Sequence, residues 1–230
     1  MSGACPIDMS FIKGVVFDLD GTLVDSRLNF DAIRREIGFP RDRGLLEHLT
    51  TLTDPNQISM AETAIHRHEM AGAAAATWMP GAQRLLTALH AMRIPTAILT
   101  RNMRAAVRLT IDSLAVPIDL VLTREDCKPK PDPEGLLHIA KAWGLHTRSV
   151  VYVGDFIFDI QAARNAGMVS CLYGNGTSGK YAREADWVIN HFDELTMALG
   201  GNDDAARPTA DTRRAPGNTG GKPQSKRTTR

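Results

Sequence analysis

The segment 17–22 (FDLDGT) places two carboxylates, Asp18 and Asp20, on either side of a single leucine. An apolar run, 15–17, comes before them, and a glycine and a hydroxyl follow. This order is typical of a buried strand that ends in a sharp turn. Two neighbouring carboxylates repel each other unless a proton or a cation lies between them. The spacing therefore indicates a site that uses a nucleophilic carboxylate, a proton donor and a divalent metal.

Further polar residues stand where other apolar runs end. Thr100 and Asp155 each close such a run, and Asp159 follows Asp155 by about one helical turn. Lys130 lies in the segment 128–133 (KPKPDP), whose prolines disfavour a helix and keep the chain extended. In a parallel sheet the carboxyl ends of the strands share one edge, so we expect these groups to surround one small volume.

The chemistry open to this set is the chemistry of phosphoryl groups. Carboxylate and carbonyl oxygens suit a hard cation such as Mg²⁺, and a lysine with a hydroxyl opposite the metal suits phosphoryl oxygens. A carboxylate can attack phosphorus once a metal screens its repulsion from the phosphate. A second acid can then protonate the leaving oxygen and later deprotonate water. We therefore expect hydrolysis of a phosphate monoester through an aspartyl-phosphate.

Strand-like and helical segments alternate along most of the chain, and this pattern predicts how the polar groups are positioned. Amphipathic helical patterns begin at Pro80-Gly81 and at Pro133. Strands that alternate with helices predict an α/β fold with a three-layer, doubly wound, Rossmann-like parallel sheet. The expected strands are 12–18, 94–100, 119–123, 149–155, 169–173 and 187–189.

Residues 28–79 interrupt this alternation with helical patterns and no strand-like run. We expect a small α-helical cap, inserted after the first strand and standing over the carboxyl edge of the sheet. The alternative is an ordinary helical elaboration of the core. The expected domains are a catalytic core (11–27 and 80–199), a cap (28–79) and a tail (200–230), with cap helices at 30–37, 45–52 and 57–76.

Composition limits the remaining possibilities. With 230 residues, 43 % hydrophobic and 23 % charged, the chain has the composition of a soluble globular protein. Residues 201–230 hold seven Lys/Arg against three Asp and almost nothing apolar, so we expect a disordered basic tail and a slightly acidic body. A slightly acidic body has no overall positive potential that would attract nucleic acid. No run of the sequence approaches the ~18 apolar residues of a membrane span.

Three scattered cysteines are too few for a disulfide framework or a zinc site. We therefore expect reduced thiols and a cytoplasmic protein that has no membrane partner and no specific nucleic-acid partner. The oligomeric state stays open.

Four segments of the chain resemble the motifs of the haloacid dehalogenase-like (HAD) phosphohydrolases. The segment 18–26 (DLDGTLVDS) is similar to the first motif, 97–102 (AILTRN) to the second and 130–133 (KPDP) to the third. The segment 153–155 (VGD), together with Asp159, is similar to the fourth. The resemblance covers about residues 12–199 and is closest to the subgroup with a small helical cap, which includes phosphoglycolate phosphatases.

The resemblance implies roles for the acids. Asp18 would be the nucleophile and Asp20 the general acid/base. Mg²⁺ would be held by Asp18, the backbone carbonyl of Asp20 and Asp155, with Asp159 acting through water or as an orienting group. The presence of Asp20 also separates this chain from the dehalogenases of the family, which do not use a second aspartate as an acid.

The resemblance also implies that Thr100 and Lys130 bind the phosphoryl group. Lys128 fits the same Lys-Pro-x-Pro pattern, but six residues after Lys130 the chain reaches the apolar Leu136, where the family begins its helix face. We therefore favour Lys130. Asn102 is a candidate phosphate ligand or, alternatively, the N-cap of the following helix.

The expected substrate is a small phosphorylated metabolite. A short cap with arginines suits a small anion such as 2-phosphoglycolate, although these arginines (Arg34, Arg35, Arg41, Arg43 and Arg67) could instead lie on a solvated face. A phosphomutase and a nucleotide or sugar-phosphate phosphatase of the same family stay open. A signalling receiver, which is phosphorylated on an aspartate, is the alternative from another class. The FDLDGT segment and the helical insertion favour an enzyme.

Overall fold

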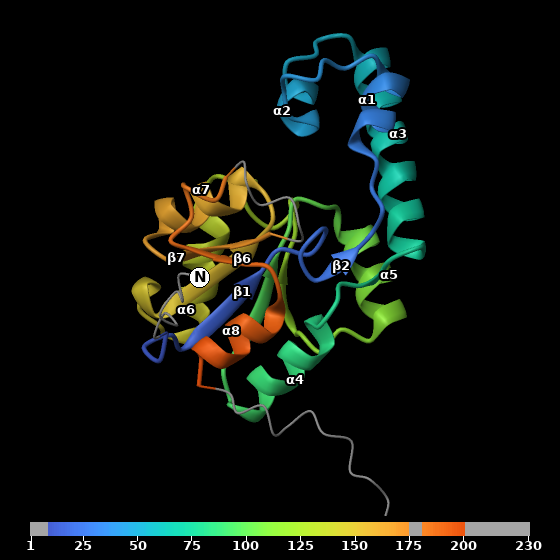
Figure 1. Cartoon of the computed structure of the whole chain (residues 1–230). Coiled ribbons are helices and arrows are strands. Elements are labelled where there is room, and N and C mark those ends of the chain that lie inside the picture. Colours follow the sequence, from blue (N-terminus) through green and yellow to red (C-terminus); the bar gives the residue numbers. More distant parts are fainter. Residues whose placement is uncertain (1–8, 175–180, 201–230) are drawn as a thin grey trace, which may run out of the picture.

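The computed structural model of the chain describes residues 9–174 and 181–200 (Figure 1). A six-stranded sheet lies at its centre, in the order β5-β4-β1-β6-β7-β8, and all neighbouring strands are parallel. The strands are β1 (Gly14–Phe17), β4 (Thr96–Leu99), β5 (Leu120–Leu122), β6 (Val150–Gly154), β7 (Val169–Tyr173) and β8 (Trp187–Ile189).

The strand order reverses beside β1. The chain runs outward from β1 through β4 to β5, then returns to β6 on the other side of β1 and continues to β7 and β8. Residue Phe17 of β1 pairs with Ile98 of β4 and with Val153 of β6, so the three strands end close to one another. In open parallel sheets ligands bind at such a reversal, beyond the carboxyl ends of the strands.

Helices cover both faces of the sheet (Figure 1). On one face lie α4 (Ala82–Ala91), α5 (Arg104–Leu114) and α8 (Phe192–Ala198). On the other face lie α6 (Glu134–Trp143) and α7 (Ile157–Ala166), and a short 3-10 turn (Thr147–Ser149) leads into β6. This three-layer arrangement confirms the predicted doubly wound α/β fold.

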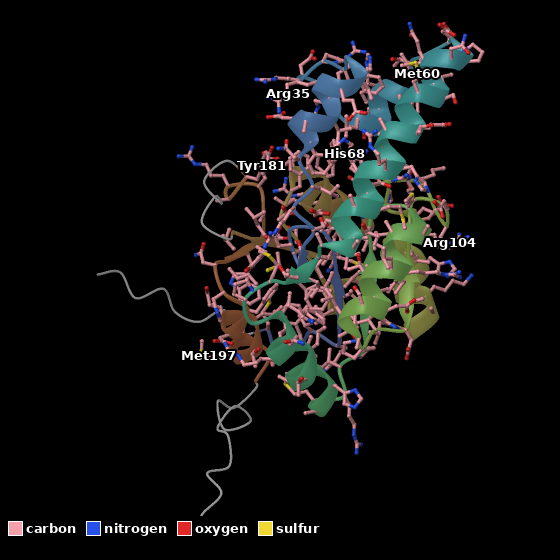
Figure 2. All side chains as sticks on the ribbon, turned by 90° about the vertical axis from the view of Figure 1, so that its right-hand side faces the viewer. Arg35, Met60, His68, Arg104, Tyr181 and Met197 are labelled. Atoms are coloured by element: carbon pink, nitrogen blue, oxygen red, sulfur yellow. The ribbon has the colours of Figure 1, made fainter. Side chains whose placement is uncertain are left out.

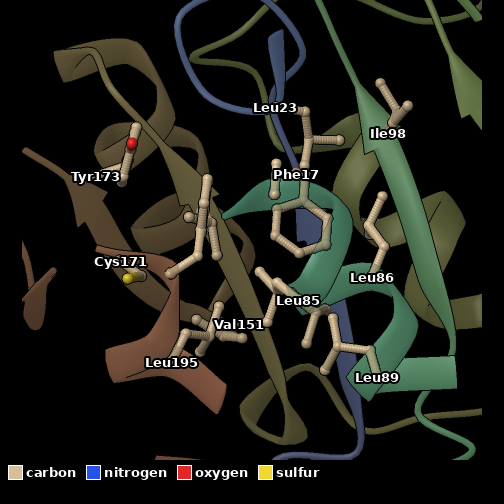
Figure 3. Packing of buried hydrophobic residues seen from close by; sticks show 14 of the residues in the cluster. Phe17, Leu23, Leu85, Leu86, Leu89, Ile98, Val151, Cys171, Tyr173 and Leu195 are labelled. Carbon is tan, nitrogen blue, oxygen red and sulfur yellow. The ribbon is translucent and has the colours of Figure 1, made fainter. Parts of the chain in front are cut away.

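The core fixes the position of β1. Its four residues, GVVF, are fully buried, and Phe17 lies against Leu85 and Leu86 of α4 (Figure 3). Burying one such side chain contributes about 1.5–3 kcal/mol to folding. Because β1 is packed on both faces, the residue that follows it cannot move without disturbing the core.

A separate group of helices stands above the sheet (Figure 1). It consists of α1 (Phe30–Ile37), α2 (Leu45–Leu49) and α3 (Pro55–Ala74), which pack around Ile33, Leu45 and Ile65. The long α3 begins at Asp54, whose side chain accepts a hydrogen bond from Asn56 N–H, with Pro55 in its first turn. The predicted helical cap inserted after the first strand is therefore confirmed, while its expected boundaries stay predictions.

The expectation that residues 28–79 contain no strand is wrong. Thr77–Trp78 forms β3, which pairs antiparallel with β2 (Val24–Asp25) and joins the cap to the core as a two-stranded ribbon. Strands of two residues are too short to show an alternating pattern in the sequence.

None of the helices among the described residues is long and apolar enough to cross a membrane. The predicted disorder of the tail concerns residues 201–230, which lie outside the described part of the chain.

Candidate active site

Asp18 directly follows β1 and extends its pairing, since its N–H donates to the carbonyl of Val153 at 2.8 Å. The chain then turns at Gly21, which has a φ of +82°. A Cβ at this position would lie 2.5 Å from Oδ2 of Asp155. Glycine thus serves two purposes here, because it adopts the left-handed conformation and lets the turn approach Asp155.

Lys130 lies at the centre of the site. Its ammonium group donates to Oδ1 of Asp18 at 2.8 Å, to Oδ1 of Asp159 at 2.6 Å and to the hydroxyl of Tyr152 at 2.8 Å. An ammonium group has three donors, so all of them are satisfied. Burial acts to lower the pKa of Lys130, but the charges of Asp159 and Asp18 outweigh it and raise this pKa. Lys130 therefore stays charged at neutral pH.

Tyr152 was not predicted as a site residue. It stands in the middle of β6, fully buried, and its hydroxyl lies 2.9 Å from the carbonyl of Leu99 and 3.1 Å from Oδ1 of Asp159. It accepts from Lys130 and can donate to either of these oxygens. A tyrosine inside an otherwise aliphatic buried run was the available signal, since a buried phenol needs a hydrogen-bond partner.

The structure brings Lys130, and not Lys128, to the acids. The side chain of Lys128 is 71 % exposed, with its Nζ 3.9 Å from a carboxylate oxygen of Asp132, whereas that of Lys130 is 4 % exposed. The backbone N–H of Lys128 donates to the side chain of Glu134. A role for Lys130 in binding a phosphoryl group stays a prediction.

Three predicted acids meet beside Lys130. Asp18, Asp155 and Asp159 each offer a carboxylate oxygen within 4.8 Å of the others. Burial and repulsion by Asp159 raise the pKa of Asp155 to about 7. Burial also raises the pKa of Asp18 well above its usual value, although Lys130 opposes this. Three ionised carboxylates and one ammonium group would leave two negative charges in a buried site.

This arrangement fits a divalent cation. Carboxylate oxygens are the ligands that Mg²⁺ prefers, and two positive charges would balance the excess charge. The carboxylate of Asp20 is not part of the cluster. Its expected contribution to the metal site, through the backbone carbonyl, stays a prediction.

Asp20 is held by Asn102. The side-chain amide of Asn102 donates to Oδ2 of Asp20 at 3.0 Å, and its Oδ1 accepts from the N–H of Met103 at 2.8 Å. The N-cap of α5 is Met103, so the expectation that Asn102 is the N-cap is wrong by one residue. Oδ1 of Asp20 is buried and has no hydrogen-bond partner among the described residues. The expected role of Asp20 as the general acid/base stays a prediction.

Thr100 follows β4, at the same edge of the sheet as Asp18. Because Phe17 pairs with Ile98, Thr100 lies one residue beyond the level of Asp18. Its buried hydroxyl accepts a hydrogen bond from Asn102 N–H at 3.1 Å, which leaves its own proton free to be donated. The expected phosphate-binding role of Thr100 stays a prediction.

Two glutamates of the cap form ion pairs with arginines of the core. Glu47 of α2 pairs with Arg101, whose guanidinium lies 4.6 Å from the centre of the Phe158 ring, and Glu69 of α3 pairs with Arg124 at 2.5 Å. Neither pair has a local signal in the sequence, since each joins residues more than 50 positions apart.

Arginines of the cap are engaged elsewhere or exposed. Arg34 pairs with Asp31 and Arg67 with Glu36, both within the cap, and Arg35 is exposed on α1 (Figure 2). Arg101, which directly follows Thr100, belongs to the core and lies against the cap, where it pairs with Glu47. The sequence-based expectation about substrate binding considered only the arginines of the cap.

Comparison with known proteins identifies the family. A model of the haloacid dehalogenase-like hydrolases matches residues 12–167. A haloacid dehalogenase-like hydrolase domain-containing protein of Arabidopsis thaliana is 30 % identical over 173 residues, which cover 70 % of each chain. A phosphoglycolate phosphatase of Chromobacterium violaceum is 27 % identical over 217 residues, covering 82 % of this chain and 97 % of that protein.

Solved structures show the same fold. A putative haloacid dehalogenase-like hydrolase from Bacteroides fragilis aligns with a TM-score of 0.68 at 23 % identity, covering 80 % of this chain and 99 % of that one. A predicted phosphoglycolate phosphatase from Haemophilus somnus aligns with a TM-score of 0.66 at 19 % identity, covering 82 % and 98 %. The chain belongs to the haloacid dehalogenase-like hydrolase family, as its four motifs predicted.

Proposed function

We propose that this protein is a Mg²⁺-dependent phosphatase that hydrolyses a small phosphomonoester through an aspartyl-phosphate on Asp18. The observation that carries the proposal is the contact between Lys130 and Asp18 at the carboxyl end of β1. This contact supports the proposal because it joins the residue that we assign as the nucleophile, Asp18, to the residue that we assign as the phosphate-binding cation, Lys130. Asp155 and Asp159 lie beside this pair, and Asp20 has one oxygen without a partner among the described residues.

In the first step, Asp18 attacks the phosphorus atom. Lys130 holds Oδ1 of Asp18, so the other carboxylate oxygen is the one presented to the substrate. A bond forms between this oxygen and phosphorus while the bond to the leaving oxygen breaks, and Asp20 gives its proton to the leaving alkoxide. Thr100 donates to a phosphoryl oxygen, where charge must be neutralised, and Lys130 donates to another in exchange for one of its three present acceptors.

In the second step, Asp20 takes a proton from a water molecule, which attacks the same phosphorus atom. The bond to Asp18 breaks, and inorganic phosphate leaves. The hydrogen bond from Asn102 fixes Oδ2 of Asp20, so Oδ1 carries the proton in both steps.

Asp18 and Asp155 would hold Mg²⁺, together with the carbonyl of Asp20, and bound Mg²⁺ would neutralise the repulsion between the carboxylates and the phosphate. Asp159 has a different role. One of its oxygens accepts from Lys130 and the other from the N–H of Phe156 at 2.9 Å. Because both oxygens are already engaged, we assign Asp159 as the group that orients Lys130.

The substrate class that we propose is a small anionic phosphomonoester such as 2-phosphoglycolate. Relatives from several bacteria carry the name phosphoglycolate phosphatase, and the cap is of the small helical kind. Arg101, one residue beyond Thr100, is a cation that would pair with a carboxylate of the substrate by exchanging its present partner, Glu47 of the cap. Membership of a hydrolase family and the helical cap favour an enzyme over a signalling receiver.

The experiment is a phosphate-release screen with and without Mg²⁺ over 2-phosphoglycolate, sugar phosphates and nucleotides. We expect release that requires Mg²⁺ and is abolished by Asp18→Asn. The matched control is Asp112→Asn, the same change at an exposed position of α5. Full activity of Asp18→Asn would contradict the proposal, and lasting phosphorylation without release of phosphate would indicate a receiver.

A further inference from the structure

A buried ion pair joins the cap to the core beside the active site. Oε1 of Glu69, on α3, accepts from Nη1 of Arg124 at 2.5 Å, and Glu69 is 8 % exposed. Its other oxygen, Oε2, is buried and has no hydrogen-bond partner within the described ranges. Arg124 belongs to the loop 123–127 that follows β5. The pair is therefore formed by two elements that are in contact only while the cap lies against the core.

Arg124 also holds the loop that carries the predicted phosphate-binding residues. The same Nη1 atom donates to the carbonyl of Arg101 at 3.1 Å, and the N–H of Arg124 lies 3.4 Å from the carbonyl of Asn102. Both carbonyls belong to the segment 100–103, between β4 and α5. One guanidinium thus binds the cap and this segment at the same time.

The segment 100–103 in turn positions groups assigned to the chemistry. It contains the hydroxyl of Thr100 and the side-chain amide of Asn102, which donates to Asp20. Arg124 is therefore connected to Asp20 through two contacts. Arg124 holds the segment 100–103, and Asn102 of this segment donates to Asp20.

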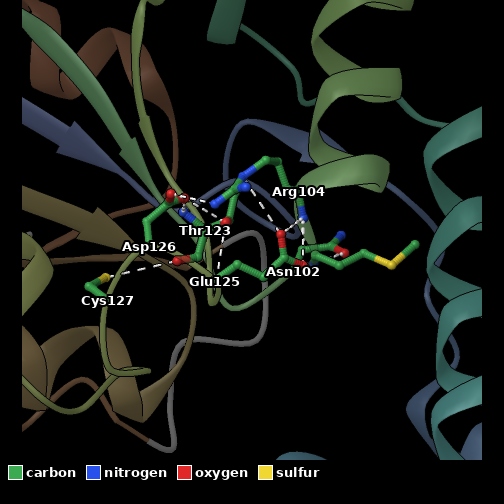
Figure 4. A network of polar contacts seen from close by, with 7 residues as sticks. Asn102, Arg104, Thr123, Glu125, Asp126 and Cys127 are labelled. Carbon is green, nitrogen blue, oxygen red and sulfur yellow. Dashed lines mark hydrogen bonds and ion pairs between the residues drawn. The ribbon is translucent and has the colours of Figure 1, made fainter.

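Neighbouring residues of the loop 123–127 fix the start of α5 in the same way (Figure 4). The carboxylate of Glu125 accepts from the N–H of Arg104 at 3.2 Å, and the guanidinium of Arg104 donates to Asp126 at 2.7 Å. Asp126 also accepts from the N–H and the hydroxyl of Thr123. These contacts lie entirely within the core, whereas Arg124 adds a contact that depends on the cap.

Apolar side chains accompany the ion pair. Met70 and Ala73 of α3, which follow Glu69 within about one helical turn, pack against Met103, the N-cap of α5, and Ala106 of α5. These contacts hold α3 against the segment 100–103, where Glu69 is itself buried. Burial raises the pKa of Glu69 and Arg124 opposes this. Arg124 is therefore the main partner that favours the charged carboxylate, with a smaller contribution from the backbone N–H of Met103.

We propose that Glu69 is a positioning residue, which acts through Arg124 to hold Thr100 and Asn102 in place when the cap docks on the core. The proposal rests on the proposed function, since the groups that it positions are those assigned to phosphoryl transfer. It adds to that function a reason why the reaction depends on the cap, namely that the docked cap completes the geometry of the core.

The experiment measures kcat and KM for Glu69→Gln, Arg124→Gln and the double variant, with saturating Mg²⁺. We expect each single variant to lower kcat by about 10-fold or more with a smaller change in KM, because the groups affected act on the transition state. The double variant should lose no more than the larger single loss, because the two residues act as one unit. Glu36→Gln, the same change in a pair that lies within the cap, should leave kcat within about twofold.

A conservative variant guards against loss of folding. Arg124→Lys keeps a positive charge, but the lysine side chain is one atom shorter, so its ammonium group does not reach the place from which Nη1 donates to both Glu69 and the Arg101 carbonyl. It should therefore fold as the wild type does and still lower kcat. Losses that multiply in the double variant, or an Arg124→Lys protein with wild-type kcat, would overturn the proposal.

A second measurement does not depend on activity. Amide hydrogen exchange at Asn102 and Met103, whose N–H groups bond to side chains of the same segment, should be faster in Glu69→Gln than in the wild type and unchanged in Glu36→Gln. Unchanged exchange in Glu69→Gln would show that the ion pair does not hold the segment. If the wild type releases no phosphate in the screen, the proposed function fails, while the exchange experiment still decides whether the cap positions this segment.

Discussion

Replacing Lys130 with methionine tests the centre of the site. Lys130→Met keeps an unbranched side chain but removes the ammonium group that donates to Asp18, Asp159 and Tyr152 at 2.6–2.8 Å. Removing one partner of a buried ion pair costs about 3–5 kcal/mol. Asp155, whose pKa is about 7, can take up a proton and relieve part of this cost. We therefore expect the free energy of unfolding of the metal-free protein to fall by about 3 kcal/mol at pH 7.

Activity should fall more steeply than stability. Lys130 is assigned as a donor to the phosphoryl oxygens, and the loss of one such donor lowers kcat by about 10²–10³-fold. The assays are phosphate release for kcat and urea unfolding for the free energy. Lys128→Met provides the control, since this lysine is two residues away and 71 % exposed. It should change the free energy of unfolding by less than about 0.5 kcal/mol. A Lys130→Met protein that keeps kcat within threefold of Lys128→Met would refute the reasoning.

Three further changes test the acids and the turn. Burial and Asp159 raise the pKa of Asp155 to about 7, so below this pH Mg²⁺ must displace a proton from Asp155 in order to bind. The affinity of the protein for Mg²⁺ should therefore fall about tenfold from pH 6.5 to 5.5. The shift of the thermal midpoint on addition of Mg²⁺ measures this affinity. The metal-free protein should show the opposite trend and lose stability as the pH rises from about 4 through 7, where the raised pKa makes ionisation unfavourable; a flat profile in both experiments would contradict this pKa. Gly21→Ala should lower the free energy of unfolding by about 1–2 kcal/mol and weaken Mg²⁺ binding as measured by calorimetry. The reason is that residue 21 has a φ of +82° and that the added Cβ would meet the carboxylate of Asp155. Unchanged Mg²⁺ binding would show that the turn can shift. Asn102→Ala should lower kcat by about 10-fold and the free energy of unfolding by only about 1 kcal/mol, because it removes the hydrogen bond that fixes Asp20. An unchanged kcat would contradict the role given to Asn102.

The sheet could be predicted from the sequence because its strands are buried on both faces. Continuous apolar runs bounded by turn residues identify such strands, and 169–173 and 187–189 match the observed β7 and β8. The expected first strand, 12–18, is longer than the observed Gly14–Phe17, although the N–H of Asp18 still pairs with the carbonyl of Val153 in the neighbouring strand. Carboxyl ends that share one edge then explain why residues far apart in the chain could be expected at one site.

The rest of the site could not be predicted, because it depends on contacts between distant segments. Glu69 and Arg124 are 55 positions apart, and each is an ordinary surface residue by type. The two residues meet because α3 packs against the start of α5, beside the loop that holds Arg124. This packing leaves no local pattern in the sequence. Asn102 shows the same limit, since its position before a helix suggested a cap, whereas its side chain reaches Asp20, 82 positions earlier.

The ribbon of β2 and β3 has a consequence for how the molecule is organised. The chain leaves the core at Asp25 and returns at Thr77, and these two residues are directly paired. The two ends of the insertion are therefore neighbours, so a tight hairpin turn between them would close the core without changing the order of its strands. The length and sequence of the inserted segment are free to vary while the sheet and its acids stay as they are. This connection allows the cap to change independently of the sheet that carries the acids.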